Sequence, residues 1–188
     1  GEYAPIFFKQ AKYTLLDQNT FWLCEKPDSV GMVGWDAALT RIATWVKLQD
    51  KKTGQILMVV NTHFDHIGTE ARRNSALLII EKIKEIVGTS PAILTGDFNV
   101  SEDWDAYKTI TNNEFILKDA HKVAGKRTGV DFTYHNFGKI PAEKCEKIDF
   151  IFVTPQIRVI SSYIPFSQLN DTLFLSDHNP EIVELEIK

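Results

Sequence analysis

The stretch 55–98 constrains the fold most strongly, because its hydrophobic pattern changes periodicity twice. It opens with QILMVVNTHF, a β-branched apolar run that a Gly-containing connection, DKKTG, joins to the alternating run 39–49. Two such runs around a glycine predict a β-hairpin. Residues 69–87 then repeat apolar side chains at helical spacing up to Gly88, which predicts an amphipathic helix ending at that glycine. The short apolar run 91–98 predicts the next strand.

The rest of the chain is mainly strand-like. KYTLLD and TFWLC predict two short strands around Gln18 and Asn19, and SEDWDAYKTITN predicts a second helix with Ser101 as its N-cap. Further β-rich runs predict strands at residues 114–118, 131–134, 147–153, 157–164 and 182–187. With no repeat, low-complexity segment or linker, the sequence predicts one α/β domain over residues 1–188, with mostly antiparallel sheets and helices on their outer faces.

Composition narrows the class of protein. A chain of 188 residues with 44% hydrophobic and 24% charged residues suits one domain with a sizeable core. A formal net charge of −4 argues against broad binding to nucleic acid, but it leaves room for a small phosphate site with a bound cation. Cys24 and Cys145 are too few for a disulfide framework, although one bridge stays open. No apolar run is long enough to span a membrane.

The N-terminus does not identify a cellular compartment. The chain begins at GEYAPIFFKQ, without a methionine, and carries no signal peptide. We therefore expect a processed or trimmed product. Its localisation is unknown, and export followed by removal of an N-terminal segment is compatible with this start.

Potentially catalytic side chains stand at the ends of two predicted strands. In VVNTHFD, Asn61 and His63 close a strongly apolar run. In PAILTGDFNV, Asp97 and Asn99 follow Gly96 and lie two positions apart, so that an extended chain places both on one face. A histidine after a strand is usually structural or solvated, and Asp and Asn after Gly are common turn formers. Either place alone is therefore compatible with a purely structural role.

Two later segments also carry potentially catalytic residues within or next to predicted strands. In EKIDFIFV, Asp149 shares a strand face with Ile151 and Val153, where a buried and unpaired acid costs several kcal/mol. It needs a partner, which a histidine or a lysine could supply. In FLSDHNP, Asp177 and His178 precede the last predicted strand, where they are also compatible with a turn.

The joint occurrence of these residues favours metal-assisted hydrolysis of a phosphate ester. Carboxylates hold a hard cation such as Mg²⁺. An acid or a His–Asp pair activates water, and another histidine donates to phosphoryl oxygens as charge builds on them.

The motifs NTHFD, GDFN, KIDFIFV and SDHNP, in this order and spacing, resemble the endonuclease/exonuclease/phosphatase superfamily. The segment 34–48, GWDAALTRIATWVKL, further resembles its deadenylase-like bacterial branch. The resemblance covers nearly the whole chain. It implies a four-layer α/β sandwich, in which two mainly antiparallel sheets pack face to face with helices outside, and a Mg²⁺ or Mn²⁺ cofactor.

The resemblance also implies roles for individual residues. His63 would hydrogen-bond the scissile phosphate, and Asp97 would orient or deprotonate the attacking water. Asn99 would position nucleophile and phosphate. His178 would be the second catalytic histidine, with Asp149 orienting its ring.

Three further residues complete the expected site. Asp177 matches a carboxylate of the metal site. Arg41 would contact phosphate and His135, in FTYHNF, would line the substrate pocket; a surface or packing role is the alternative for both.

One departure from the family pattern concerns the early strands. The family's early Asn and its metal-binding Glu have no counterpart here, since Glu2 and Glu25 stand in unsuitable contexts. We therefore expect an N-terminally incomplete domain, completed by self-association or by a separate N-terminal fragment.

The sequence as a whole predicts a metal-dependent phosphoric ester hydrolase, foremost a phosphodiesterase. The substrate would be a phosphorylated small molecule, lipid or nucleotide, and duplex DNA is not favoured. The alternatives are a phosphomonoesterase acting on a small sugar or inositol phosphate, and a non-catalytic fragment or binding module of the same fold.

Overall fold

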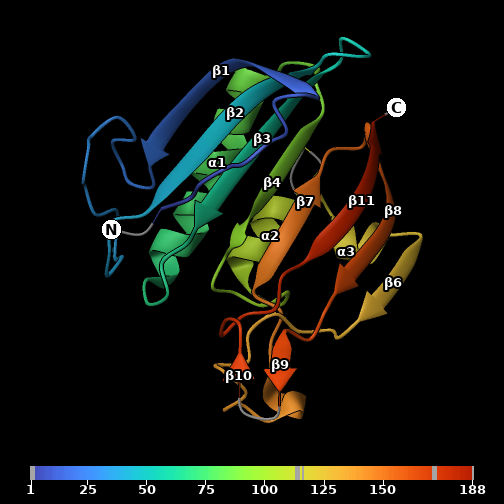
Figure 1. Ribbon diagram of the computed structural model, residues 1–188. Helices are drawn as coiled ribbons and strands as arrows, with labels where there is room; N and C mark the ends of the chain where they lie inside the picture. Colours follow the sequence, from blue (N-terminus) through green and yellow to red (C-terminus); the bar gives the residue numbers. More distant parts are fainter. Residues whose placement is uncertain (1–2, 113–114, 116, 171–172, 188) are drawn as a thin grey trace.

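A six-stranded sheet forms the centre of the molecule, whose computed structural model describes residues 3–112, 115, 117–170 and 173–187 (Figure 1). Its strand order is β1-β2-β3-β4-β7-β5, and only β3 and β4 among the described neighbours run parallel. The bounds are β1 Tyr13–Trp22, β2 Ile42–Asp50, β3 Ile56–His63, β4 Ala92–Asp97, β5 Lys118–Asp119 and β7 Asp149–Val153.

The parallel pair follows from the helix between its strands. Helix α1 (Thr69–Val87) carries the chain from the end of β3 back to the start of β4, which is the crossover that parallel strands require. The helix begins after Gly68, where the Asp36 carboxylate accepts the backbone N–H groups of Glu70 and Ala71. It ends at Gly88, whose φ of 59° suits a glycine.

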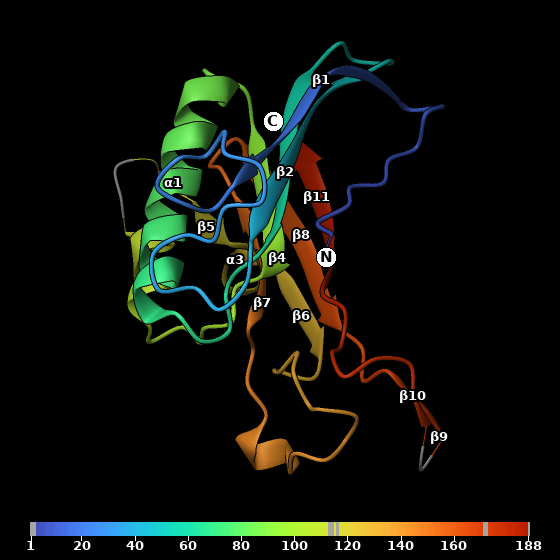
Figure 2. The ribbon, with the colours of Figure 1, turned by 90° about the vertical axis from the view of Figure 1, so that its left-hand side faces the viewer.

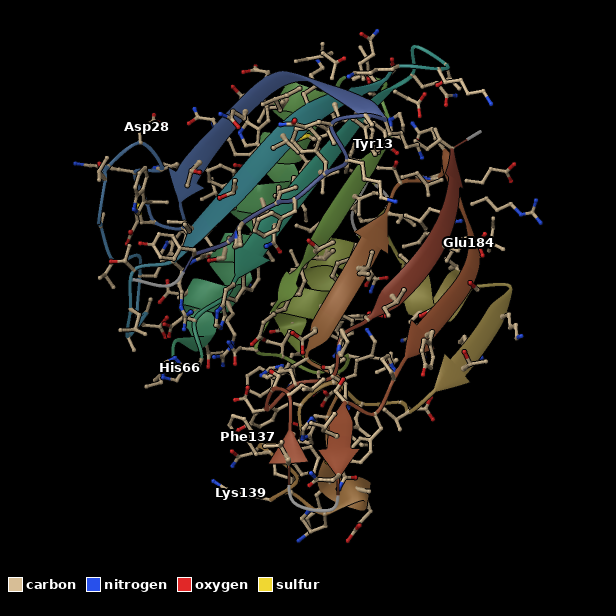
Figure 3. The ribbon with its side chains drawn as sticks, in the orientation of Figure 1. Tyr13, Asp28, His66, Phe137, Lys139 and Glu184 are labelled. Carbon is tan, nitrogen blue, oxygen red and sulfur yellow. The ribbon has the colours of Figure 1, made fainter. Side chains whose placement is uncertain are left out.

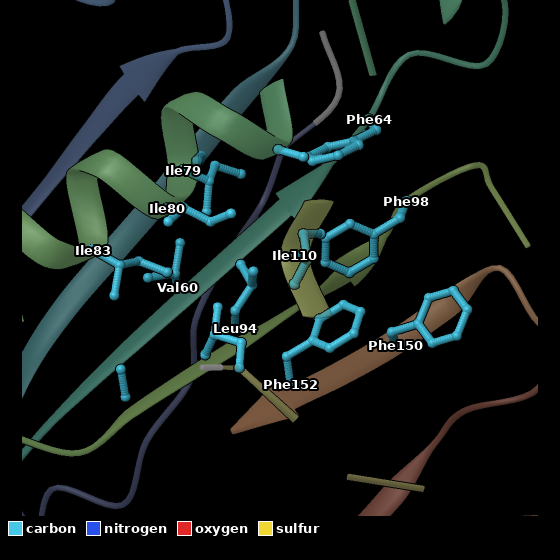
Figure 4. Packing of buried hydrophobic residues seen from close by; sticks show 14 of the residues in the cluster. Val60, Phe64, Ile79, Ile80, Ile83, Leu94, Phe98, Ile110, Phe150 and Phe152 are labelled. Carbon is cyan, nitrogen blue, oxygen red and sulfur yellow. The ribbon is translucent and has the colours of Figure 1, made fainter. Parts of the chain in front are cut away.

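The main core lies between this sheet and the helices. Isoleucines of α1, Ile110 of α2 (Asp105–Thr111) and alternate residues of β3, β4 and β7 pack together (Figure 4). Phe98 meets Phe150 and Phe152 edge to face, with ring centroids 6.0 and 5.2 Å apart. Phe150 and Phe152 lie on the apolar face of KIDFIFV, which faces the helices. Asp149 therefore points to the other side of the sheet.

A three-stranded sheet covers part of that other side (Figure 2). Its order is β11-β8-β6, with bounds β6 Lys126–Gly129, β8 Ile157–Ile164 and β11 Ile182–Ile187. Val159, Ile151 and Leu185 belong to a second apolar cluster between the two sheets. The described residues thus form a mixed α/β fold with sheets packed together and helices outside, as predicted.

The remaining elements are short. They are α3 (Ala120–Val123), the 3-10 helix η1 (Ala142–Lys144) and the hairpin of β9 (Gln168–Asn170) and β10 (Leu173–Phe174). The segment with Phe137 and Lys139 projects with this hairpin beyond the two sheets (Figure 3). No helix within the described ranges combines the length and the apolar composition needed to cross a bilayer.

Several predicted element bounds are wrong. The two strands expected around Gln18 and Asn19 are one strand, β1, with a bulge between Leu15 and Asp17. Helix α2 starts after Trp104, because the Ser101 hydroxyl donates to Asp103 and does not cap the helix.

Two predicted strands also need correction. Residues 131–134 form no strand, since Tyr134 makes only isolated bridges. Of the strand expected at 114–118, Glu114 and Ile116 lie outside the described residues, and β5 begins at Lys118.

Candidate active site

Three of the predicted residues form a row across neighbouring strands. His63 ends β3, Asp97 ends β4 and Asp149 begins β7. In the sheet register His63 is opposite Asp97, and Asp97 is opposite Asp149. Because opposed residues point to the same face of a sheet, the topology alone brings these side chains together. That face is the one away from α1.

A close approach of two strands fixes the middle of this row. Gly96 lies opposite Thr62, and a Cβ atom added at Gly96 would lie 2.2 Å from the Thr62 carbonyl oxygen. A side chain at this position would therefore push β3 and β4 apart. Glycine before Asp97 allows the backbones to meet, which sets the distance between His63 and Asp97.

His178 reaches the row from the loop after β10. Its Nδ1 lies 2.7 Å from Oδ2 of Asp149, a short charge-assisted hydrogen bond. Its backbone N–H donates to the Ser176 hydroxyl, and its ring lies against Tyr134 at a centroid distance of 4.9 Å. These contacts come from two sides and hold the ring in one orientation. His178 is the partner that the acid in KIDFIFV requires.

Asp97 lies between the two histidines. Its Oδ2 is 3.4 Å from Nε2 of His63 and 3.9 Å from Nε2 of His178. Burial and the charge of Asp149 raise the pKa of Asp97 to about 6, against the opposing effects of the Asn99 N–H, His178 and Arg41. Asp97 can therefore exchange a proton near neutral pH, as a general base must.

The pKa of His178 is shifted in the direction that favours its cation. Burial lowers this pKa, but the hydrogen bond and charge of Asp149, with the charges of Asp97 and Asp177, outweigh burial and raise it. The protonated imidazole is therefore favoured more than that of an ordinary histidine, and in this form it can donate from Nε2.

Asn99 is tied to the row through both its backbone and its side chain. Its backbone N–H donates to Oδ1 of Asp97, and its side-chain Nδ2 donates to the Phe64 carbonyl. Its φ of 50° lies in the left-handed region, which asparagine tolerates better than most residues. Asp97 and Asn99 are thus joined by a tight turn, and the amide links the ends of β3 and β4.

Arg41 lies beneath the site, with only 4% of its surface exposed. Its Nε is 3.5 Å from Oδ1 of Asp65, and its Nη2 is 3.1 Å from Nδ1 of His66. The positive charge of Arg41 lowers the pKa of Asp97, which places it near that carboxylate. Burial beside Asp65 gives Arg41 a structural role, whereas its contact with phosphate stays a prediction.

The structure does not bring Asp177 and His135 into the row. The backbone carbonyl of Asp177 accepts from the N–H groups of His135 and Asn136. His135 is 1% exposed and packs its ring against Phe166 and Phe174, in an aromatic cluster under the β9–β10 hairpin. Burial and the charge of His178 lower the pKa of His135, so that a neutral ring suits this apolar position.

Two positioning residues were missed by sequence reasoning. Asp65 is 1% exposed and accepts the backbone N–H groups of Ala38, Leu39, Ile67 and Gly68, which gathers two loops around Arg41. Thr133 is fully buried, and its hydroxyl accepts the N–H groups of Ile148 and Asp149. Asp65 is the last residue of the motif NTHFD and could have been noticed there. Nothing in FTYHNF distinguishes Thr133 from a strand residue.

The row borders a cavity of about 430 Å³. His63, Asp97 and Asp149 line it together with Glu181 and residues 3 and 4 of the N-terminal segment. Asp97, Asp149 and His178 each offer one possible ligand atom, and these atoms lie within 4.8 Å of one another. Two carboxylates this close repel each other, as the raised pKa of Asp97 indicates, and a bound cation would relieve that repulsion.

Comparison with known proteins agrees with this arrangement. The chain is 63% identical to an endonuclease/exonuclease/phosphatase of known structure from Bacteroides vulgatus, with a TM-score of 0.93 over 96% of this chain and 69% of that one. A mannosyl-6-phosphatase from Bacteroides thetaiotaomicron is 34% identical, with a TM-score of 0.87 and the same shares of the two chains.

A curated relative is the uncharacterized protein of Acanthamoeba polyphaga mimivirus that is 30% identical over 175 residues. The match covers 88% of this chain, which spans 63% of the length of that relative. Residues 7–178 match the family model described as Endonuclease/Exonuclease/phosphatase family. The chain therefore belongs to the endonuclease/exonuclease/phosphatase family.

Proposed function

We propose that this chain hydrolyses phosphate esters with the help of a divalent cation. The observation that carries the proposal is the convergence of His63, Asp97, Asp149 and His178 at one edge of the sheet, with the 2.7 Å bond between Asp149 and His178. Family members are phosphoester hydrolases, which agrees with this chemistry. The proposal treats residues 1–188 as belonging to one domain, as the sequence predicts.

Each residue has a role that follows from its contacts. Asp97 orients the attacking water and takes its proton. His178 donates from Nε2 to the phosphoryl oxygens as negative charge builds, while Asp149 holds its Nδ1–H. His63 binds the same phosphoryl group from the other side of Asp97. Asn99 and Arg41 keep the strand ends and Asp97 in place.

The donor set suits a hard cation such as Mg²⁺ or Mn²⁺. Asp97 and Asp149 would hold it, since their oxygens and a ring nitrogen of His178 lie within 4.8 Å of one another. When bound, such a cation neutralises charge on the phosphoryl oxygens and polarises the ester.

The substrate class has two candidates. A phosphodiester is the first expectation from the sequence, whereas the 34% identity to a mannosyl-6-phosphatase favours a monoester of a small sugar. The cavity of about 430 Å³ lies at the low end of the range for small-molecule sites and accommodates either. With a net charge of −4, duplex DNA is the least favoured substrate.

A substrate panel tests the proposal. Turnover of bis-p-nitrophenyl phosphate, p-nitrophenyl phosphate and mannose 6-phosphate is measured with Mg²⁺, with Mn²⁺ and with excess chelator. We expect hydrolysis of at least one compound with metal and none with chelator. Full activity in chelator would refute the metal mechanism, and no turnover under any condition would favour a binding module of the same fold.

A further inference from the structure

A buried ion pair lies directly behind the Asp149–His178 pair and has no part in the roles above. Nζ of Lys147 is 2.9 Å from Oε2 of Glu181, with side chains only 6% and 3% exposed. Lys147 stands two residues before Asp149, and Glu181 stands three residues after His178. Each member of the ion pair therefore belongs to the segment that carries one member of the catalytic pair.

Lys147 is bound to the strand as well as to the loop. Its Nζ donates to the backbone carbonyl of Asp149 at 2.8 Å and lies 3.8 Å from the centroid of the Phe150 ring. The ammonium group thus bridges the first residue of β7 and the Glu181 carboxylate. Movement of the loop away from β7 would break this bridge.

Glu181 is fixed from the opposite side. Its Oε1 accepts from the Ser162 hydroxyl at 3.4 Å, and that hydroxyl lies 2.8 Å from Nδ1 of His121. Ser162 belongs to β8 of the three-stranded sheet, so the carboxylate ties this sheet to β7. Glu181 also lines the same cavity as Asp149.

Stability alone does not account for such a pair. Burying two charges costs several kcal/mol per ion, and apolar residues of similar volume often replace buried ion pairs without loss of stability. The burial at Glu181 is severe enough to raise its pKa although Lys147 and Ser162 oppose the rise. An ion pair does supply direction, because it has one favourable arrangement where apolar contacts have many.

We propose that Lys147 and Glu181 are positioning residues, which hold the β7 strand and the SDHNP loop in the register that brings Asp149 and His178 to hydrogen-bond distance. The effect on rate rests on the proposed function, whereas the effect on the Asp149–His178 bond does not. Neither residue needs to touch substrate.

The test replaces the ion pair by apolar side chains. Lys147→Met/Glu181→Leu removes both charges and keeps most of the volume, and Glu181→Gln keeps the size and the acceptor for Ser162. Lys82→Met/Glu85→Leu is the matched control, because Lys82 and Glu85 form an ion pair on the exposed side of α1, 2.9 Å apart. Near-ultraviolet circular dichroism verifies that each variant is folded.

The first readout is the downfield proton resonance of the His178 Nδ1–H, which reports its bond to Asp149 and is assigned by its loss in His178→Ala. We expect it to weaken or move upfield in both pair variants and to stay unchanged in the control. The second readout is turnover, where kcat should fall on the order of 10-fold with KM nearly unchanged, since misplacement of catalytic groups by about 1 Å costs up to 10²-fold.

The outcomes separate the two proposals. A folded double variant with an unchanged resonance and wild-type kcat overturns the positioning role. If the double variant does not fold, Glu181→Gln decides in the same way. If the pair variants lose the resonance and the wild type turns over no substrate, positioning is supported and hydrolysis is refuted. If the wild type turns over substrate and the pair variants keep the resonance, hydrolysis is supported and positioning is refuted.

Discussion

At the residue scale, the site places two carboxylates that repel each other beside a histidine whose cation they attract. Asp97 lies beside Asp149 and has its pKa raised to about 6, and His178 has its pKa raised by the carboxylates around it. A carboxylate and an imidazole with pKa values displaced toward neutrality are suited to exchanging protons there. For Asp97 this displacement carries a cost in stability, because the ionised carboxylate is disfavoured in the folded protein.

Replacing Asp97 by asparagine should stabilise the metal-free protein. The folded-state pKa of about 6 lies above the usual 3.8, so the ionised carboxylate weakens the fold increasingly as pH rises between these values. The shift corresponds to roughly 2–3 kcal/mol above pH 6. Asp97→Asn should therefore raise the free energy of unfolding by about that much at pH 8, and less at pH 5, in urea titrations with chelator.

An exposed carboxylate provides the control for this experiment. Asp28→Asn, in the loop between β1 and β2, makes the same substitution outside the site and is measured at both pH values. A gain at Asp97 that does not depend on pH would contradict the assignment of the raised pKa. Added Mg²⁺ should stabilise the wild type more than Asp97→Asn.

Asp149 and His178 should act as one unit in catalysis. Asp149→Asn keeps the shape of the side chain and leaves its backbone bonds to Thr133 and Lys147 in place. Its kcat should fall roughly 10²-fold, as should that of His178→Ala, and the double variant should lose little more. Steady-state kinetics on the best substrate of the panel measures this. Multiplicative losses in the double variant would show that the residues act independently.

At the scale of elements, the approach of β3 to β4 sets the geometry of the site. The strands are parallel because α1 lies between them in the chain, and they end together at His63 and Asp97. Gly96 permits the approach. The elements thus place residues that are 34 positions apart in the sequence at one edge of the sheet.

Gly96→Ala should therefore damage both stability and activity. The added Cβ meets the Thr62 carbonyl at 2.2 Å, which forces the strands apart. We expect a loss on the order of 3 kcal/mol in the free energy of unfolding and a fall in kcat larger than the unfolded fraction explains. Gly31→Ala is the control, because Gly31 also has a positive φ, of 77°, but has open space around it. It should cost about 1 kcal/mol and leave kcat unchanged.

At the scale of the whole molecule, two sheets pack together and leave an exposed strand edge. β11 stands at the edge of the three-stranded sheet in the part of the chain that is described. Ile182 of β11 and Tyr163 of the neighbouring strand β8 are 53% and 45% exposed and lie opposite each other in the register. An open edge with apolar side chains favours pairing with another chain, although Glu184 and Glu186 of the same strand oppose it.

We expect weak self-association through this edge. Sedimentation velocity at rising protein concentration should show a dimer whose fraction grows, and Ile182→Lys should reduce it because a charge on an edge strand opposes pairing. Leu77→Lys is the control, since Leu77 is 44% exposed on α1, away from the edge. A monomer at every concentration, or equal effects of both substitutions, would contradict the prediction.

Most of the local structure and the chemical groups of the site could be predicted from the sequence alone. The change from alternating to helical periodicity predicted the β2–β3 hairpin, α1 and β4, because periodicity records which face of an element is buried. The position of Asp149 on an otherwise apolar strand predicted that it has a partner. The four motifs, through their resemblance to a family, supplied His63, Asp97 and His178 as residues of one site.

The geometry in which these side chains meet came from the tertiary structure. Register places His63, Asp97 and Asp149 in line, and a loop far along the chain brings His178 to Asp149. The tertiary structure also surrounds His135 with aromatic rings. The physical reason is that contacts between distant segments depend on how whole sheets pack, whereas periodicity and motifs describe only neighbours along the chain.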